Sequence, residues 1–125
     1  MLRGKGRYLG TEMDGKWYRR YRAEGFFVRG SGEWWLTPGS FCFKRRLLTT
    51  PMEIPFEALL AVRTGAWHAG QWVIRPLVVK LDWELDGRCL SSGYVFSKTH
   101  EGTRQMAAHL DSLASRARQG SLETL

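Results

Sequence analysis

The sequence has only two cysteines and no long hydrophobic run, and each shortage excludes a class of protein. Cys42 and Cys89 are too few for a disulfide framework, and both lie in apolar segments, so we expect buried, reduced, intracellular thiols. The longest apolar runs, such as residues 77–79, are far too short to span a bilayer, and no apolar stretch follows the basic N-terminus as it would in a secretory signal. We therefore expect a cytoplasmic protein that approaches a bilayer only peripherally, at the inner membrane face.

Catalytic and metal-binding motifs are also missing from the sequence. The chain has no Cys-x-x-Cys, no His-Glu-x-x-His and no glycine-rich phosphate loop. His100 and His109 are too far apart on one predicted helix for zinc ligands, and His68 falls in a predicted loop. We therefore expect no enzyme activity, no metal and no cofactor.

The composition that remains is that of a small basic globular domain. The chain has 125 residues, of which 43% are hydrophobic and 25% are charged, so we expect one domain with a real core. The net charge of +7 comes entirely from the first 50 residues, which hold 11 basic and 4 acidic side chains, whereas residues 51–125 hold 8 of each. This asymmetry favours an acidic partner, such as anionic lipid headgroups, nucleic acid or an acidic protein surface.

Alternating apolar and polar residues predict about seven short antiparallel strands. The clearest strand is Leu77–Leu85, which is followed by the hairpin dipeptide Asp86–Gly87 and a partner strand over residues 88–97. The other predicted strands cover residues 26–29, 33–37, 40–45, 52–56 and 59–64.

Glycine and proline predict where these strands begin and end. The glycines among residues 1–19 predict an irregular, basic arm before the domain. Gly30–Gly32 is expected to form a tight reversal, and Pro38–Gly39 a turn. Pro55 has no amide hydrogen to donate, so its strand should lie at a sheet edge or be very short.

The period changes from two to that of a helix after residue 97. A helix over residues 100–118 should begin at a cap formed by Thr99 or Ser97 and end at Gly120, which leaves a frayed tail over residues 119–125. Its apolar face contains Met106, Leu110, Leu113 and Ala117. The fold class is therefore mainly β, with a strongly bent or barrel-like antiparallel sheet closed at one end by a C-terminal helix.

The order of these segments resembles the pleckstrin-homology-like superfold, and within it the GRAM-type and bacterial PH-like domains. The resemblance is carried by Gly25–Val28, by Trp34–Phe43 with its Leu-Thr and turn, by Ile54–Val62 and by Val95–Phe96 directly before the helix. It covers roughly residues 20–118. The resemblance implies a PH-like barrel that binds lipids, peptides or partner proteins and performs no chemistry.

Many PH domains that bind inositol phosphates use a lysine, a spacer and a basic-x-Arg pair on the first two strands. Arg20 and Arg22 match that pair, but Lys16 lies closer to it than in the family pattern, and Lys5 falls in the glycine-rich arm.

Two basic clusters and one aromatic loop are the candidate binding residues. Basic side chains interleaved with aromatic ones suit an anionic membrane surface or single-stranded nucleic acid. The candidate anion-binding residues are Lys16, Arg19, Arg20, Arg22, Lys44, Arg45 and Arg46. The candidate aromatic contact loop contains Trp67, His68 and Trp72.

The sequence favours a non-catalytic PH/GRAM-like module for an anionic membrane surface or a partner protein. One alternative is a homo-oligomeric interaction module with no lipid role. Another, weaker alternative is a small nucleic-acid-binding β-barrel, because Ser92–Phe96 resembles the aromatic strand of an RRM but lacks its leading glycine and closing aromatic.

Overall fold

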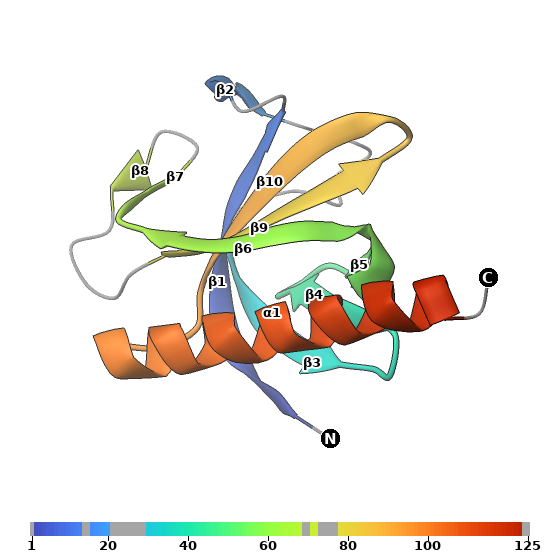
Figure 1. The fold of residues 1–125 in the computed structure, drawn as a ribbon. Coiled ribbons are helices and arrows are strands. Elements are labelled where there is room, and N and C mark those ends of the chain that lie inside the picture. Colours follow the sequence, from blue (N-terminus) through green and yellow to red (C-terminus); the bar gives the residue numbers. More distant parts are fainter. Residues whose placement is uncertain (1, 14–15, 21–29, 69–70, 73–77, 124–125) are drawn as a thin grey trace.

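The computed structural model describes residues 2–13, 16–20, 30–68, 71–72 and 78–123. They form one curved antiparallel sheet, a small separate hairpin and a C-terminal helix (Figure 1). The strands are β1 (Arg3–Met13), β2 (Lys16–Arg20), β3 (Gly30–Leu36), β4 (Ser40–Arg45), β5 (Met52–Pro55), β6 (Leu59–Gly65), β7 (Trp67–His68), β8 (Gln71–Trp72), β9 (Val78–Leu85) and β10 (Arg88–Val95). The helices are the 3₁₀ turn η1 (Phe56–Ala58) and α1 (His100–Glu123).

The sheet follows the order β5-β4-β3-β1-β10-β9-β6, with β2 paired to β1 beside this path. This path confirms the predicted fold class, an antiparallel sheet of about seven strands. The predicted strand over residues 26–29 lies outside the described residues, and β1, which was not predicted, is the seventh strand of the path. Within the described residues no strand ladder joins β5 to β6, so the sheet is strongly curved rather than closed into a barrel. Pro55 ends β5 at one edge of the sheet, as its missing amide hydrogen predicts.

The glycine-rich N-terminal segment is a strand, and the prediction of an irregular arm over residues 1–19 was wrong for Arg3–Met13. β1 pairs with β3 through Arg3–Tyr8 and with β10 through Arg7–Met13. A Cβ atom at Gly4 would lie 2.9 Å from Nε1 of Trp34, and one at Gly6 would lie 2.9 Å from the Val95 carbonyl oxygen. The glycines therefore allow other groups to approach β1 closely, and they do not break the strand.

Gly30–Gly32 also forms part of a strand, β3, and not the predicted tight reversal. A Cβ atom at Gly30 would lie 2.5 Å from Nε of Arg45, and one at Gly32 would lie 2.8 Å from the Arg45 Cα. Both glycines are needed because β4 and the Arg45 side chain pass very close to them. The Pro38–Gly39 turn is confirmed, since the Thr37 amide donates to the Ser40 carbonyl over 2.9 Å.

The predicted β9–β10 hairpin is confirmed. Leu85 pairs with Arg88 around the two-residue turn, and both turn residues have positive φ angles, 51° at Asp86 and 78° at Gly87. The apolar face of β9 turns inward, with Val79, Leu81 and Trp83 buried.

Aromatic rings from β1, β4 and β10 pack together in the core, on the concave side of the curved sheet. The Tyr94 ring packs on the rings of Tyr8, Phe41 and Phe43 at centroid separations of 5.0 to 5.3 Å. A chain of buried polar groups joins β1, β10 and β9: Tyr8 hydrogen bonds to Thr11, whose hydroxyl lies 2.7 Å from that of Ser92, and Trp83 Nε1 donates to Ser92 over 3.0 Å. Because every member has a partner, the polar groups can stay inside the core without the cost of an unmade hydrogen bond.

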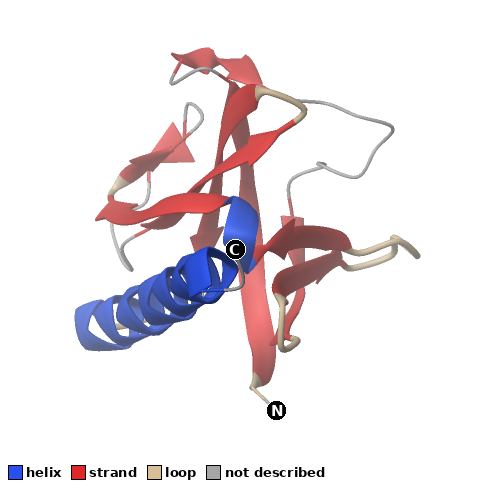
Figure 2. Ribbon diagram, turned by 45° about the vertical axis from the view of Figure 1, so that its right-hand side comes forward, coloured by secondary structure: helices blue, strands red, loops and turns tan. Residues whose placement is uncertain are grey.

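Helix α1 lies across one side of the sheet and packs mainly on β6 and η1 (Figure 2). Thr99 caps the helix, since its hydroxyl accepts a hydrogen bond from the Gly102 amide over 3.0 Å. The Ser97 hydroxyl in turn accepts a hydrogen bond from the Thr99 amide, just before the helix begins. The predicted apolar face is confirmed, with Leu110 fully buried and Met106, Leu113 and Ala117 packed against the core.

The helix continues beyond its predicted end. It runs through Gly120 to Glu123, so the expected stop at Gly120 and the frayed tail over 119–123 were wrong. A single glycine lowers helix stability by only about 1 kcal/mol, and no proline follows it to end the helix.

We expect the substitutions Gly32→Ala and Gly120→Ala to change stability in opposite directions. The Cβ atom at position 32 meets the backbone of β4, so Gly32→Ala should lower the free energy of unfolding by about 1–3 kcal/mol. At position 120 nothing lies within 4 Å, so alanine should raise it by up to about 1 kcal/mol through helix propensity. Urea denaturation followed by circular dichroism measures both, and a stable Gly32→Ala variant would contradict the close approach of β3 and β4.

Candidate functional site

The exposed face of β1 carries three cations, none of which is among the anion-binding candidates predicted from the sequence. Arg3, Lys5 and Arg7 alternate with Gly4 and Gly6, and all three are exposed. Since successive side chains of a strand point to opposite faces, the cations share the outer face while the glycines meet the interior. The sequence signal for this row is the period-two repeat of basic residues, but the glycines between them predict irregular structure and so mask it.

The same face continues across β3 and β4. The register places Lys5 opposite Glu33 and Glu33 opposite Lys44, so these three side chains form one row. The next row contains Arg3, the half-buried Trp35 and Cys42.

Beyond β4, the outer face ends at Arg46. The amide of Arg46 donates to the Ser31 carbonyl over 2.8 Å, and Ser31 pairs with Arg7, so Arg46 adds a cation beside the strand row. We call this surface the basic face; it comprises Arg3, Lys5, Arg7, Trp35, Lys44 and Arg46, with Glu33 and Glu53 as its acidic members.

The three residues of the predicted 44–46 cluster do not act as a unit. Lys44 and Arg46 lie on the basic face, whereas Arg45 points to the other side of β4, over Gly30. The Arg45 guanidinium also donates to the Arg46 carbonyl over 3.2 Å. Arg45 therefore stabilises the turn after β4, and only its two neighbours are placed to contact a ligand on the basic face.

The other sequence candidates lie elsewhere in the chain. Lys16, Arg19 and Arg20 belong to β2, which pairs with the far end of β1 opposite Glu12 and Met13, while Arg22 lies outside the described residues. β2 therefore contacts β1 near Met13, several residues away from Arg7, where β1 pairs with β3. The structure does not bring the two predicted basic clusters together.

The predicted aromatic loop is partly a hairpin. Trp67 and His68 form β7, and they pair with Trp72 and Gln71 of β8. Trp67 and Trp72 are therefore opposite each other across a two-stranded ladder, rather than in an open loop.

On β6 and β9, Arg63 is paired with an acidic side chain, unlike the cations of the basic face. Arg63 makes two hydrogen bonds to Asp82, of 2.6 and 2.9 Å, and these raise the pKa of Arg63. Burial, with the nearby Arg63 charge, lowers the pKa of Lys80 on the same strand as Asp82. Among the described residues, by contrast, no ion pair involves Arg3, Lys5, Arg7, Lys44 or Arg46.

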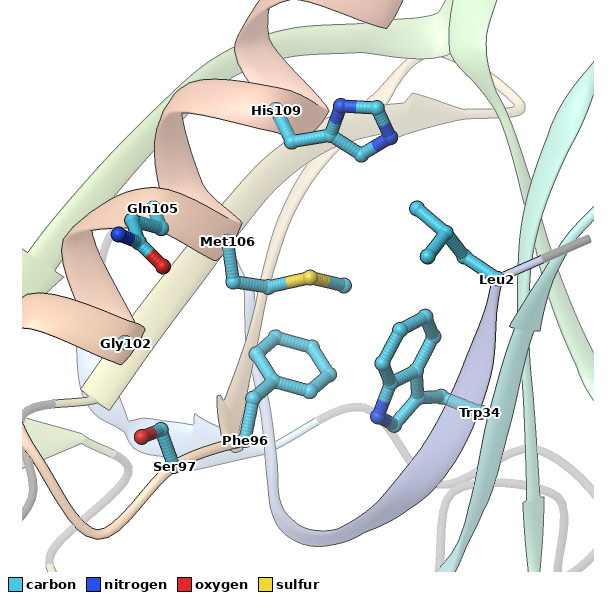
Figure 3. A pocket seen from close by; sticks show the side chains of 8 residues that line it. All are labelled: Leu2, Trp34, Phe96, Ser97, Gly102, Gln105, Met106 and His109. Carbon is cyan, nitrogen blue, oxygen red and sulfur yellow. The ribbon is translucent and has the colours of Figure 1, made fainter.

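An open pocket lies between the start of α1 and the first residues of β1 (Figure 3). Its volume is about 320 Å³, and the side chains of Leu2, Trp34, Phe96 and Met106 point toward one another across it. Trp34 and Phe96 meet edge to face at a centroid separation of 5.7 Å. The polar groups at its rim, Ser97, Gln105 and His109, belong to the helix and the segment before it, and no sequence candidate lines the pocket.

The described residues contain no cluster of three or more histidine, cysteine or acidic side chains that could hold a metal ion. In the same part of the chain, no helix combines the length and apolar character needed to cross a bilayer.

The two thiols have different surroundings. Cys42 is buried as predicted, but Cys89 is exposed, contrary to the sequence-based prediction. Burial, together with the Glu53 carboxylate 3.8 Å from the sulfur, raises the pKa of the Cys42 thiol to about 11.

Comparison with known proteins supports the architecture. The bacterial PH domain-like family matches residues 1–110, which include all the described strands, β1 to β10, and extend into α1. A search of curated proteins found no match to the chain.

We expect Cys89 to react with iodoacetamide at pH 8 more than about tenfold faster than Cys42, because the thiolate is the nucleophile and burial disfavours it at Cys42. Mass spectrometry of peptides from the native protein, sampled over time, gives both rates. Unfolded protein gives the reference rate of each cysteine. Equal alkylation rates for Cys42 and Cys89 in the native protein would show that folding does not protect Cys42.

Proposed function

The chain belongs to the bacterial PH domain-like family, and from this premise we propose that it is a non-catalytic binding module for an anionic membrane surface. The ligand is held by the basic face. The observation that carries the proposal is the set of cations Arg3, Lys5, Arg7, Lys44 and Arg46 on one side of the sheet, which form no ion pair with any residue that the structure describes.

The geometry of the basic face suits a surface more than a small molecule. Its cations project from β1 and from β4 with the turn after it, which lie two strand spacings or roughly 10 Å apart, and the pocket of Figure 3 lies at the other side of β1. A row of exposed cations can approach many headgroups at once without enclosing any of them. Each cation close to an anionic bilayer contributes about 1 kcal/mol, so several together give useful but salt-sensitive attraction.

Trp35 adds an aromatic group to this surface. It is half-buried and lies between Arg3 and Cys42 in the register. Tryptophan favours the boundary between headgroups and acyl chains, because its ring is apolar and its N–H can form a hydrogen bond. The β2 cations Lys16, Arg19 and Arg20, with Arg22 and the hairpin residues Trp67, His68 and Trp72, remain candidates for a second contact.

We expect the protein to sediment with vesicles of phosphatidylcholine and phosphatidylserine but not with phosphatidylcholine alone. Binding should weaken markedly between 50 and about 300 mM salt, because the attraction is screened over about 10 Å. The double variant Lys5→Glu/Arg7→Glu should lose most of this binding, since it reverses two of the five positive charges of the basic face. Co-sedimentation at both salt concentrations measures the effect.

The matched control is Arg104→Glu/Arg116→Glu, which changes the net charge equally but alters exposed cations of α1. It should retain at least half of the wild-type binding. If wild-type protein sediments with neither vesicle, the membrane proposal is wrong, and a protein-interaction or homo-oligomeric role takes its place. Fluorescence anisotropy with a short oligonucleotide tests the nucleic-acid alternative, for which we expect a flat titration at physiological salt.

A further inference from the structure

Leu47, in the turn after β4, is the large apolar side chain with the greatest exposure among the described residues. It is 88% exposed, against 47% for Leu60 and 51% for Leu2. The turn is closed by the Leu48 amide, which donates to the Arg45 carbonyl over 3.1 Å. Leu47 thus occupies the third position of a four-residue turn and projects away from the core.

The backbone conformation of Leu47 is unfavourable for leucine. Its φ angle is 74°, and a positive φ at the third position of a turn normally selects glycine or asparagine. Residues other than glycine rarely adopt this conformation because Cβ crowds the backbone. Neither the turn nor the core therefore explains a leucine here, and the side chain gains nothing from burial within the domain.

Basic side chains directly precede Leu47 in the chain. Residues 44–52 contain three basic side chains and no acidic one. The Arg46 amide is hydrogen bonded to Ser31, the register partner of Arg7, which places the turn about two strand spacings, or roughly 10 Å, from β1. Leu47 therefore projects at the margin of the basic face, with Lys44 and Arg46 beside it.

We propose that Leu47 is an apolar anchor that inserts into an anionic bilayer at the boundary between headgroups and acyl chains. The inference rests on the proposed function, since it needs the basic face to bring the turn to the bilayer. An aliphatic side chain at the tip of a projecting turn fits a fluid lipid layer, which closes around it. A protein partner would instead need a matching cavity. Lys44 and Arg46 then lie at headgroup level, where long basic side chains are favourable.

The decisive variant is Leu47→Gly, which removes the apolar side chain and suits the positive φ. It should unfold at the same temperature as wild type or higher, so reduced binding cannot be attributed to misfolding. We expect its partition into phosphatidylcholine/phosphatidylserine vesicles to fall roughly tenfold, the effect of one aliphatic side chain leaving an apolar environment. Its elution from a heparin column should not change, because no charge is altered. The control Leu60→Ser removes an exposed leucine of β6 and should change partition less than about twofold.

A second measurement reports directly how deeply position 47 enters the bilayer. A Cys89→Ser background removes the exposed native thiol, and Leu47→Cys or Leu60→Cys then carries an environment-sensitive fluorophore. On anionic vesicles the label at position 47 should shift to the blue and be quenched by acyl-chain spin labels, whereas the label at position 60 should do neither.

The outcomes separate the two proposals. If wild-type protein binds anionic vesicles, Leu47→Gly binds equally well and the label at 47 stays in water, the anchor is wrong and the basic face stands. If wild-type protein binds no vesicle, both are wrong. Weaker binding by Leu47→Gly with unchanged heparin elution and a quenched label at 47 establishes the anchor.

Discussion

The contact between the Trp34 ring and the glycines of β1 positions both surfaces described above. Because Gly4 and Gly6 have no side chains, the Trp34 ring can lie close over the strand and meet Phe96 edge to face. The residues between and beside these glycines are basic, and the pleat turns them outward. One side of β1 therefore borders an apolar pocket while the other carries a row of cations, and a Cβ atom at either glycine would disturb both.

The two sides of this domain differ in whether their cations form ion pairs. On β6 and β9, Arg63 is neutralised by a two-hydrogen-bond contact with Asp82. On β1 and β4 the described cations have no such ion pair, although Glu33 lies between Lys5 and Lys44 in the register. Like charges held side by side repel each other, and an anionic ligand relieves that repulsion. Five of the eleven basic side chains among the first 50 residues thus lie on one face of the sheet.

Local signals were sufficient to predict the regular part of the fold. The alternation of Leu77–Leu85, the Asp86–Gly87 turn and the cap at Thr99 each act within a few residues, so the sequence predicted the last hairpin and the start of the helix. β1 and the start of β3 were missed because their glycines are explained only by Trp34 and Arg45, which approach from other strands. The end of α1 was missed because one glycine weakens a helix without ending it.

The same limitation explains what was missed in the candidate site. Lys44 and Arg46 were selected as part of a basic run, but the cations of β1 are interrupted by glycine and form a row only once the strand is recognised. Leu47 gives no signal in sequence, since its exposure and positive φ are properties of the folded turn.

The pairing of β1 with β10 joins segments about eighty residues apart, so synthesis on the ribosome imposes an order on folding. β1, β3, β4 and β5 can pair as they emerge, but the second edge of β1 stays open until residues 88–95 follow. During that interval Leu9 and Tyr8 lack their final neighbours, and an unpaired strand edge is prone to join another chain. The nascent chain is therefore most vulnerable to aggregation just before its last hairpin is complete, which is the stage at which a chaperone would have the greatest effect on yield.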